Sequence, residues 1–346
     1  VCSSETCVNI AKLVNGAIAI PHQHGCCEIG DDFDTTKRTL IGFGKNPNVG
    51  AVLVVGLGCE GIQAKEIADG ISESGKPVEY IVIQEEGGTC KTVARGAEIA
   101  GKMARELAKQ NKVEFDISEI VLGLECGGSD PTSGLASNPA IGVASDMLVA
   151  EGGSSILSET TECIGAEHLL AERFVNDIEK EKFLSMVKRV EDRSYAAGHD
   201  LREGQPTPGN KAGGLTTIEE KSLGCMHKAG KSTFMGALEY AEEIPYDKKG
   251  LYFMDTPGQD IDSITGMVAG GAQIIVFSTG RGTPTGSPIA PVIKITGNTG
   301  TYNKMTDNID INAGKIITDG VKLPDMGKEL YDMIINVCNG EYTKAE

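Results

Sequence analysis

The sequence predicts an α/β protein built on a parallel, doubly wound sheet in its N-terminal half. Short apolar runs alternate with longer segments that have helical periodicity, the pattern of repeated strand–helix units. Most apolar runs end in glycine-rich polar loops, as strands of open α/β sheets do. With 346 residues and 40% hydrophobic residues, the chain is long enough for two domains. We expect a Rossmann-like α/β domain over residues 1–160 and a C-terminal α/β catalytic region over residues 161–346, with one site shared between them.

The individual elements follow from periodicity and from capping residues. Asn138 and Pro139, for example, are a cap and a first-turn proline, and they predict a helix to residue 149. Right-handed crossovers would bring the ends of all first-half strands to one sheet edge. The predicted strands are 16–20, 51–55, 78–83, 120–124 and 154–157 in the first half, and 250–254, 272–277 and 291–295 in the second. The other predicted helices are 6–15, 35–45, 62–74 and 89–110, with a helix or helix pair over 165–199.

Composition and charge exclude several classes of protein. The formal net charge of −17 argues against a nucleic-acid partner, because the phosphate backbone requires a basic surface. No apolar run reaches the roughly 18 residues of a membrane span, so we expect no membrane partner. Ten cysteines do not make a disulfide framework in a chain of this size, which indicates a reducing, cytoplasmic location.

Polar side chains gather in the loops that follow the predicted strands. The loop after 120–124 has the sequence Glu-Cys-Gly-Gly-Ser-Asp-Pro-Thr-Ser-Gly, which is long and unusually polar for a strand–helix connection. Histidine, cysteine and glutamate residues follow the other strands of the first half, so we expect these side chains to meet at one sheet edge. The residues at this edge include His22, His24, Cys26, Cys59, Glu60, Cys126, Asp130 and Glu159.

Two other interpretations of these loops stay open. Gly56-x-Gly58-x-x-Gly61 follows a strand and opens a helix, as in a dinucleotide-binding fingerprint, which would indicate an NAD-dependent dehydrogenase. Against it, Glu60 would place a carboxylate near the pyrophosphate. Three cysteines at strand ends, Cys26, Cys59 and Cys126, would also fit an iron–sulfur cluster, or they are small residues packed under the loops.

With these loops in place, the chain resembles the large catalytic part of the altronate/galactarate dehydratase family. The resemblance implies a divalent metal, Fe²⁺ first with Mn²⁺ or Mg²⁺ as alternatives, and dehydration of a sugar acid to a 2-keto-3-deoxy acid. Sulfolactate sulfo-lyase belongs to the same superfamily and is the second candidate. The matching segments are 38–48, 55–60, Cys126-Gly-Gly-Ser-Asp130 with Ser133-Gly134 and Asn138-Pro139, 156–160 with 165–168, 209–217 with 220–224, 254–258 and 279–282.

The sequence also departs from the family pattern. The histidine segment reads Pro21-His22-Gln23-His24-Gly25-Cys26-Cys27, where the family more often has a single histidine before glycine and cysteine. We expect the family's usual opening segment and its small N-terminal domain to lie outside this sequence, as a separate domain or subunit. We also expect a homo-oligomer.

The implied reaction defines the roles that the candidate residues would fill. Removing a weakly acidic proton next to a carboxylate requires a base and a metal or cations that stabilise the resulting enediolate. Arg281, in a Thr-Gly-Arg-Gly turn, is the best candidate for a bidentate clamp on the substrate carboxylate. The candidates for catalysis are His22, Glu60, Asp130, Glu159, Lys211 and Lys221; for the metal His22, His24, Cys59 and Cys126; and for the small anionic sugar-acid substrate Ser129, Ser133, Asn138, Asn210 and Arg281.

Overall fold

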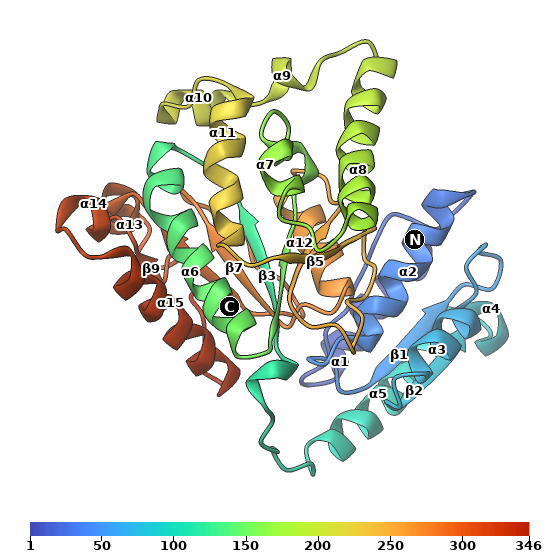
Figure 1. Cartoon of the computed structure of the whole chain (residues 1–346). Helices are drawn as coiled ribbons and strands as arrows, with labels where there is room; N and C mark the ends of the chain where they lie inside the picture. Colours follow the sequence, from blue (N-terminus) through green and yellow to red (C-terminus); the bar gives the residue numbers. More distant parts are fainter. Residues whose placement is uncertain (346) are drawn as a thin grey trace. The chain divides into compact units, whose positions relative to one another are not determined.

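The computed structural model describes residues 1–345 and consists of two compact units. Unit 1 comprises residues 1–114 with 269–271, and unit 2 comprises residues 115–268 together with the chain from residue 272 onward. Both units combine helices with parallel strands, so the predicted α/β class is confirmed (Figure 1).

Unit 1 is built around a two-stranded parallel sheet, in which Val52 pairs with Val78 and Gly56 with Val82. Ile62, Ile67 and Ile71 form a small core on the helix between the two strands and the turn before it. The elements are α1 Ser4–Leu13, α2 Asp31–Lys45, β1 Val52–Gly56, α3 Ala64–Ser72, β2 Val78–Val82, α4 Ile83–Glu86 and α5 Thr89–Leu107.

Unit 2 contains a seven-stranded sheet with the order β5-β6-β4-β3-β7-β8-β9, and all of its strand pairs are parallel. Every residue of β4, β7 and β8 is buried, as expected for strands of a parallel sheet that is covered on both faces. The strands are β3 Val121–Cys126, β4 Ser154–Leu157, β5 Phe234–Leu238, β6 Leu251–Met254, β7 Ile274–Ser278, β8 Val292–Thr296 and β9 Ile311–Asn312.

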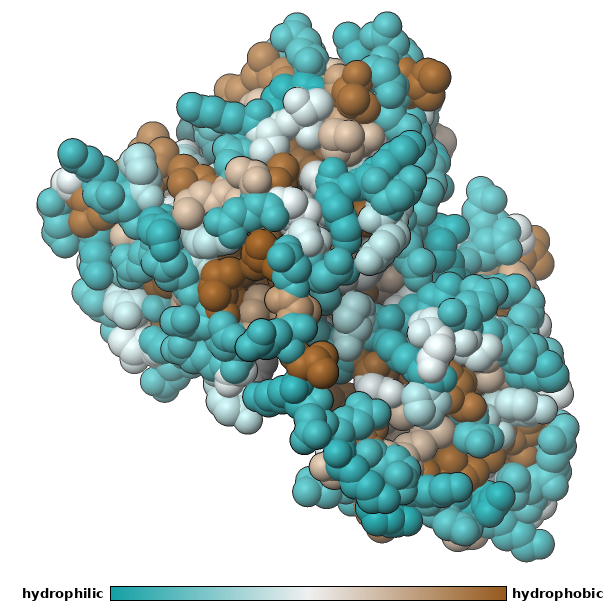
Figure 2. All heavy atoms as spheres, turned by 60° about the horizontal axis from the view of Figure 1, so that its bottom comes forward, coloured by the Kyte–Doolittle hydropathy of each residue, from teal (hydrophilic) through white to brown (hydrophobic). Residues whose placement is uncertain are grey.

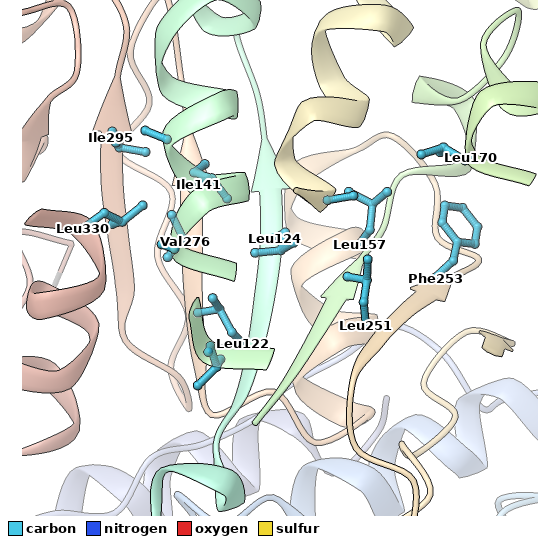
Figure 3. Packing of buried hydrophobic residues seen from close by; sticks show 14 of the residues in the cluster. Leu122, Leu124, Ile141, Leu157, Leu170, Leu251, Phe253, Val276, Ile295 and Leu330 are labelled. Carbon is cyan, nitrogen blue, oxygen red and sulfur yellow. The ribbon is translucent and has the colours of Figure 1, made fainter. Parts of the chain in front are cut away.

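Helices α6 (Asn138–Ala150) and α15 (Leu323–Cys338) pack together over one face of this sheet (Figure 1). Ile141 of α6 and Leu330 of α15 point toward Leu124 and Val276 in the core (Figure 3). The remaining helices of unit 2 are the 3₁₀ turns η1 Ile117–Glu119, η3 Thr160–Glu162 and η4 Met226–Ala229, the π-helix η2 Ser133–Ser137, and α7 Glu167–Ala171, α8 Asp177–Ala196, α9 Leu201–Gly204, α10 Pro208–Gly213, α11 Ile218–Cys225, α12 Asp260–Ala269, α13 Thr299–Lys304 and α14 Lys315–Thr318.

The structure corrects the predicted arrangement of the strands. Residues 16–20 form no strand, and residues 83–86 form the short helix α4 instead of a strand end. β1 and β2 belong to one sheet and β3 and β4 to another, so the first half has no common sheet edge. The predicted boundary at residue 160 falls between β4 and β5 of the large sheet, whereas the compact units divide after Glu114. The boundary differs because β3 and β4, which precede residue 160, pair with β7 and β6, which follow it.

The face shown in Figure 2 is mainly hydrophilic, with apolar side chains in small groups. Within residues 1–345, the helices are all too short or too polar to span a bilayer. The ten cysteines are free thiols.

Candidate metal centre and active site

A cluster of buried polar side chains lies at the carboxyl ends of three neighbouring strands in unit 2. Cys126 is the last residue of β3, Glu159 follows β4 after one residue, and Asp260 begins the helix after β6. In the sheet order these strands are adjacent, as β6-β4-β3. The carboxyl ends of parallel strands are where open α/β sheets bind their ligands, so this edge is the candidate site.

Helix α11 and the following turn η4 supply the other half of the cluster. Lys221 and Cys225 lie one helical turn apart on the buried face of α11, and Lys228 continues that face three residues later. α11 can approach η2 closely because Gly134 and Gly224 face each other; a Cβ on Gly134 would lie 3.0 Å from the Cα of Gly224. This close packing brings Cys225 to the end of β3.

Cys126, Glu162 and Cys225 form a potential metal-binding group. One ligand atom from each lies within 4.8 Å of the others, and all three residues are buried. The two Sγ atoms are 3.5 Å apart, and Sγ of Cys225 lies 2.7 Å from Oε2 of Glu162. Two thiolates and a carboxylate are a donor set suited to Fe²⁺ or Zn²⁺, whereas Mg²⁺ and Mn²⁺ prefer oxygen ligands.

Two buried lysines neutralise the glutamates of the cluster. Lys228 is 1% exposed; its Nζ forms an ion pair with Oε2 of Glu159 and lies 2.9 Å from Sγ of Cys126. Lys221 forms an ion pair with Oε1 of Glu162 and donates a hydrogen bond of 2.8 Å to Gln205. Burial disfavours a charged lysine, but the facing Cys126 and Glu159 groups hold the pKa of Lys228 above its usual value.

Glu159 adopts an unusual backbone conformation. Its φ and ψ angles are both 71°, in the left-handed region that a residue with a side chain rarely occupies. Its N–H donates to Oγ1 of Thr256 at 2.8 Å, and its Oε2 accepts from the N–H of Cys126 at 3.0 Å. Its Oε1 is buried and accepts no hydrogen bond within residues 1–345. Backbone strain together with an unpartnered buried oxygen is typical of a functional position.

The charges of the cluster fit a divalent cation. The hydrogen bond with Cys225 and then burial raise the pKa of the Cys126 thiol well above its usual value, so without a metal this thiol is protonated. Each lysine is paired with one glutamate, so the charges of these four side chains balance. A divalent cation that displaces the protons of both thiols leaves this balance unchanged, and it satisfies the need for ligands to be deprotonated.

A fourth acidic residue, Glu125, lies beside the cluster on β3 and is completely buried. Burial, and after it the charge of Glu159, raise the pKa of Glu125 well above its usual value. Its Oε2 accepts hydrogen bonds from Ser263 at 2.6 Å and from Ser158 at 3.3 Å. Through these hydrogen bonds Glu125 links β3 to α12.

The glycine-rich loop after β3 holds the predicted residues Ser129, Asp130, Ser133 and Asn138. Oδ1 of Asp130 accepts from the N–H groups of Thr132 and Ser133 at 2.9 and 3.2 Å, and Oδ2 accepts from Asn298 at 3.0 Å. These bonds occupy the carboxylate, so Asp130 organises the loop in this structure.

The other polar residues of the loop divide into those with and those without partners. Oγ of Ser133 accepts from the N–H of Asp130, and Nδ2 of Asn138 donates to the carbonyl of Gly224 at 2.9 Å. Oγ of Ser129 and Oδ1 of Asn138 are buried and lack partners among the described residues. These two atoms are available to a ligand, as expected for substrate-binding residues.

Arg281 and Asn210 contact the same loop, and Lys211 is the next residue after Asn210 on α10. The N–H of Arg281 donates to the carbonyl of Gly128 at 2.8 Å, and Asn210 donates to the carbonyl of Ser129 at 2.9 Å. A Cβ on Gly213 would lie 3.4 Å from Cδ of Arg281, so the arginine side chain runs along the end of α10. Arg281 and Lys211 are exposed, and both remain candidates for binding a substrate carboxylate.

The predicted ligands His22, His24 and Cys59 belong to unit 1, whereas Cys126 belongs to unit 2. His24 and Cys59 are exposed. Nδ1 of His22 accepts a hydrogen bond of 3.3 Å from the N–H of His24, and Nδ1 of His24 lies 3.6 Å from Oε1 of Glu28. The expectation that these residues join Cys126 at one sheet edge was wrong, because β1 and β3 lie in different sheets. The ligand set predicted from sequence therefore competes with the Cys126, Glu162 and Cys225 group.

Glu60 closes the glycine-rich turn that resembles a dinucleotide fingerprint. Its two carboxylate oxygens accept hydrogen bonds from the N–H groups of Leu57 at 2.9 Å and Gly58 at 2.6 Å. Such amides bind the pyrophosphate in a dinucleotide site. Because the chain's own carboxylate occupies them, the turn does not fit NAD. Glu60 stabilises this turn, and its catalytic role stays a prediction.

Sequence reasoning missed Glu162, Cys225 and Lys228. None of them directly ends a strand, because Glu162 lies in η3, Cys225 in α11 and Lys228 in η4. A usable indication was nevertheless present: Ile218, Lys221, Ser222, Cys225 and Lys228 recur at helical spacing. Four polar residues on the face that carries Ile218 point to a helix that buries polar groups against a site.

Reactive side chains buried at the carboxyl edge of a parallel sheet are characteristic of an α/β enzyme. Residues 117–346 match the D-galactarate/altronate dehydratase C-terminal family, and residues 1–108 match the D-galactarate dehydratase/altronate hydrolase second-domain family. The chain belongs to the D-galactarate/altronate dehydratase family, as its motifs predicted.

Three curated relatives illustrate the range of this family. The (2R)-sulfolactate sulfo-lyase subunit beta of Chromohalobacter salexigens is 38% identical over 340 residues, covering 97% of this chain and 86% of the relative. The altronate dehydratase of Bacillus subtilis is 37% identical and covers 96% of this chain and 66% of its own. The galactarate dehydratase (L-threo-forming) of Escherichia coli is 37% identical and covers 88% of this chain and 59% of its own. Dehydratases are hydro-lyases, so the chain is related along almost its whole length to lyases.

Proposed function

We propose that the protein is a metal-dependent hydro-lyase that removes water from a sugar acid such as altronate or galactarate to give a 2-keto-3-deoxy acid. The observation that carries this proposal is the buried Cys126, Glu162 and Cys225 group at the carboxyl edge of the sheet. It is supported by two dehydratase relatives that are 37% identical to the chain. The metal we propose is Fe²⁺, because the two cysteines favour it over Mg²⁺ and Mn²⁺.

The residues of the site would have the following roles in the reaction. A metal at Cys126, Glu162 and Cys225 would supply a Lewis acid that stabilises negative charge on the substrate. Arg281 and Lys211 would bind the substrate carboxylate, while Ser129 and Asn138 would hydrogen-bond to its hydroxyl groups. Lys221 and Lys228 keep the buried cluster neutral and hold Glu162 and Glu159 in position. Oε1 of Glu159, which has no partner within the described chain, would accept from a substrate hydroxyl.

Elimination of sulfite from sulfolactate is a second candidate. The sulfo-lyase subunit has 86% of its length covered by this chain, more than the 66% and 59% of the two dehydratases. The chemistry is comparable, because a proton next to a carboxylate is removed and a group leaves the neighbouring carbon. The same carboxylate clamp and the same metal would serve both reactions.

The test is a substrate screen with protein purified without oxygen and loaded with Fe²⁺. Aldonates, aldarates and sulfolactate are offered separately, and 2-keto acid and sulfite are both measured. Keto acid without sulfite from an aldonate or aldarate supports the hydro-lyase, and equal amounts of keto acid and sulfite from sulfolactate support the sulfo-lyase. A protein that forms keto acid from none of these compounds contradicts both.

Binding of the substrate carboxylate is expected to depend on Arg281. Its planar guanidinium holds both carboxylate oxygens and stays protonated while the neighbouring carbon loses its proton. Arg281→Ala should therefore lower kcat/KM by roughly 30-fold or more, equivalent to about 2 kcal/mol of lost transition-state binding. Arg281→Lys should have a smaller effect, because it keeps the charge but loses the fork.

The matched control is Arg193→Ala, which removes an exposed arginine of α8 in the same unit. Its kcat/KM should stay near that of the unmodified protein. Near-native kcat/KM in a folded Arg281→Ala protein would show that the carboxylate is bound elsewhere.

The proposal also includes the cellular location and the oligomeric state of the protein. We expect a cytoplasmic enzyme, since its ten free thiols suit a reducing compartment. We also expect a homo-oligomer that works with a separate small domain or subunit. Its molar mass in solution, measured by light scattering, tests the oligomeric state.

A further inference from the structure

Asp260 places a carboxylate directly against the backbone that follows Cys126. It is the first residue of α12 and comes directly after the loop that follows β6. A Cβ on Gly127 would lie 2.5 Å from Oδ2 of Asp260 and 2.6 Å from Oδ1, closer than any side chain tolerates. Glycine at position 127 is therefore what allows the Asp260 carboxylate to reach the edge of the cluster.

Asp260 differs from the other carboxylates of the cluster in its access to solvent. Glu125 and Glu159 are 0% exposed and Glu162 is 5% exposed, and each is engaged by a lysine or by serine hydroxyls. Asp260 is only half-buried, and its neighbours Pro257 and Gln259 are exposed. No side chain among residues 1–345 donates a hydrogen bond to its carboxylate. A substrate that enters from solvent would meet this carboxylate before it meets the buried ones.

The charges around Asp260 suit a group that exchanges protons. Burial, and after it the negative charge of Glu162, raise the pKa of Asp260, while Lys221 and Lys228 act in the opposite direction. A carboxylate with a raised pKa is a stronger base than an ordinary aspartate. The charges of Glu162, Lys221 and Lys228, all from the cluster itself, act on this carboxylate.

We propose that Asp260 is the base that removes the proton from the carbon next to the substrate carboxylate. This inference rests on the proposed function and adds the residue that starts the reaction. The C–H bond breaks, its proton moves to an oxygen of Asp260, and its electron pair is taken up by the carboxylate as an enediolate. The carboxylate then re-forms, a C=C bond forms and the neighbouring C–O bond breaks, which leaves an enol. The leaving hydroxide takes up a proton to give water, and Asp260 returns its proton to solvent. The enol gains a proton at the carbon that lost the hydroxyl and loses its O–H proton, which gives the keto acid.

The test compares Asp260→Asn and Asp260→Glu with Asp262→Asn, the matched control. Asp262 is an exposed carboxylate in the same first turn of α12, so its variant makes a similar change in charge without touching Gly127. For each protein we would measure kcat and KM, iron content, and exchange of the substrate's α-proton with deuterium from D₂O.

The proposal predicts a specific combination of results. Asp260→Asn should lower kcat by roughly 10²- to 10⁴-fold, the usual contribution of a general base, and should abolish deuterium exchange while iron content and KM stay near normal. Asp260→Glu should recover part of kcat, and its profile of kcat/KM against pH should shift. Asp262→Asn should behave like the unmodified protein in every measurement.

Other results would overturn the proposal in distinguishable ways. An active unmodified protein whose Asp260→Asn variant keeps kcat and deuterium exchange would show that another residue takes the proton. A variant that loses its iron together with its activity would make Asp260 a support of the metal site instead of the base. An unmodified protein that turns over none of the offered acids would contradict the proposed function, and the inference would fall with it.

Discussion

Replacing Cys225 with serine is expected to remove bound Fe²⁺ from the protein, whereas replacing both His22 and His24 with alanine should leave it in place. Cys225 and Glu162 complete the buried group around Cys126, and the two sulfurs are 3.5 Å apart. Loss of an outer partner of a metal ligand typically lowers metal affinity 10- to 100-fold, and loss of a thiolate ligand should cost at least as much. Cys126 belongs to both the group seen in the structure and the set predicted from sequence. Replacing Cys225 or the two histidines therefore distinguishes the ligand set seen in the structure from the one predicted from sequence.

The measurement is the iron content per chain after anaerobic purification and gel filtration, together with turnover. Cys338→Ser is the matched control, because it removes a partly buried thiol on α15 that is not part of the group. If the His22→Ala/His24→Ala protein loses its iron and Cys225→Ser keeps it, the ligand set predicted from sequence is the correct one. Loss in both variants would mean that ligands from both sets contribute.

Replacing Lys228 with methionine is expected to destabilise unit 2 severely. The lysine is 1% exposed and its partner Glu159 is 0% exposed, so methionine would leave a buried carboxylate without its counter-charge. Breaking one side of a buried ion pair typically costs about 3–5 kcal/mol. The expected result is a loss of this size in the free energy of unfolding, measured by urea denaturation, with turnover also lost.

A second substitution separates the lost charge pair from lost packing. In Lys228→Met/Glu159→Gln the unpaired charge is gone, so part of the stability should return. Lys231→Met, at an exposed lysine three residues further along, should change the unfolding free energy little. If the double variant is as unstable as Lys228→Met, the lysine stabilises the protein through packing and not through Glu159.

The sequence was a good guide to individual strands and a poor guide to their pairing. The fully buried strands β4, β7 and β8 lie within two residues of their predicted positions, because the apolar residues of each strand stand next to polar, glycine-containing loops. β9 has only two residues, too few to form a pattern, and β5 interrupts its apolar run with a glycine. Nothing local to β3 says that its partners are β4 and β7, since β7 lies about 150 residues further along the chain.

The same limit applies to the site. Cys126 and Glu159 could be predicted because they lie at strand ends within recognisable loops. Cys225 and Lys228 could not be predicted in this way, because they join the site through the approach of α11 to η2 at Gly134 and Gly224. Glu60 and Asp130 were candidates on the same grounds, and their catalytic roles stay predictions. Each is a carboxylate in a promising loop, yet the backbone N–H groups beside it take up its oxygens.

The left-handed backbone of Glu159 has a consequence for how this position tolerates variation. At φ 71° a glycine would relieve the conformational cost that glutamate bears, so Glu159→Gly combines a gain for the main chain with the loss of a carboxylate. In a library of variants sorted by protein abundance, glycine at this position should therefore rank above alanine, which keeps the strain and also lacks the carboxylate. Sorted by turnover, the two should be equally depleted. Comparing glycine with alanine at position 159 would then show the effect of the backbone conformation on protein abundance separately from the effect of the carboxylate on turnover.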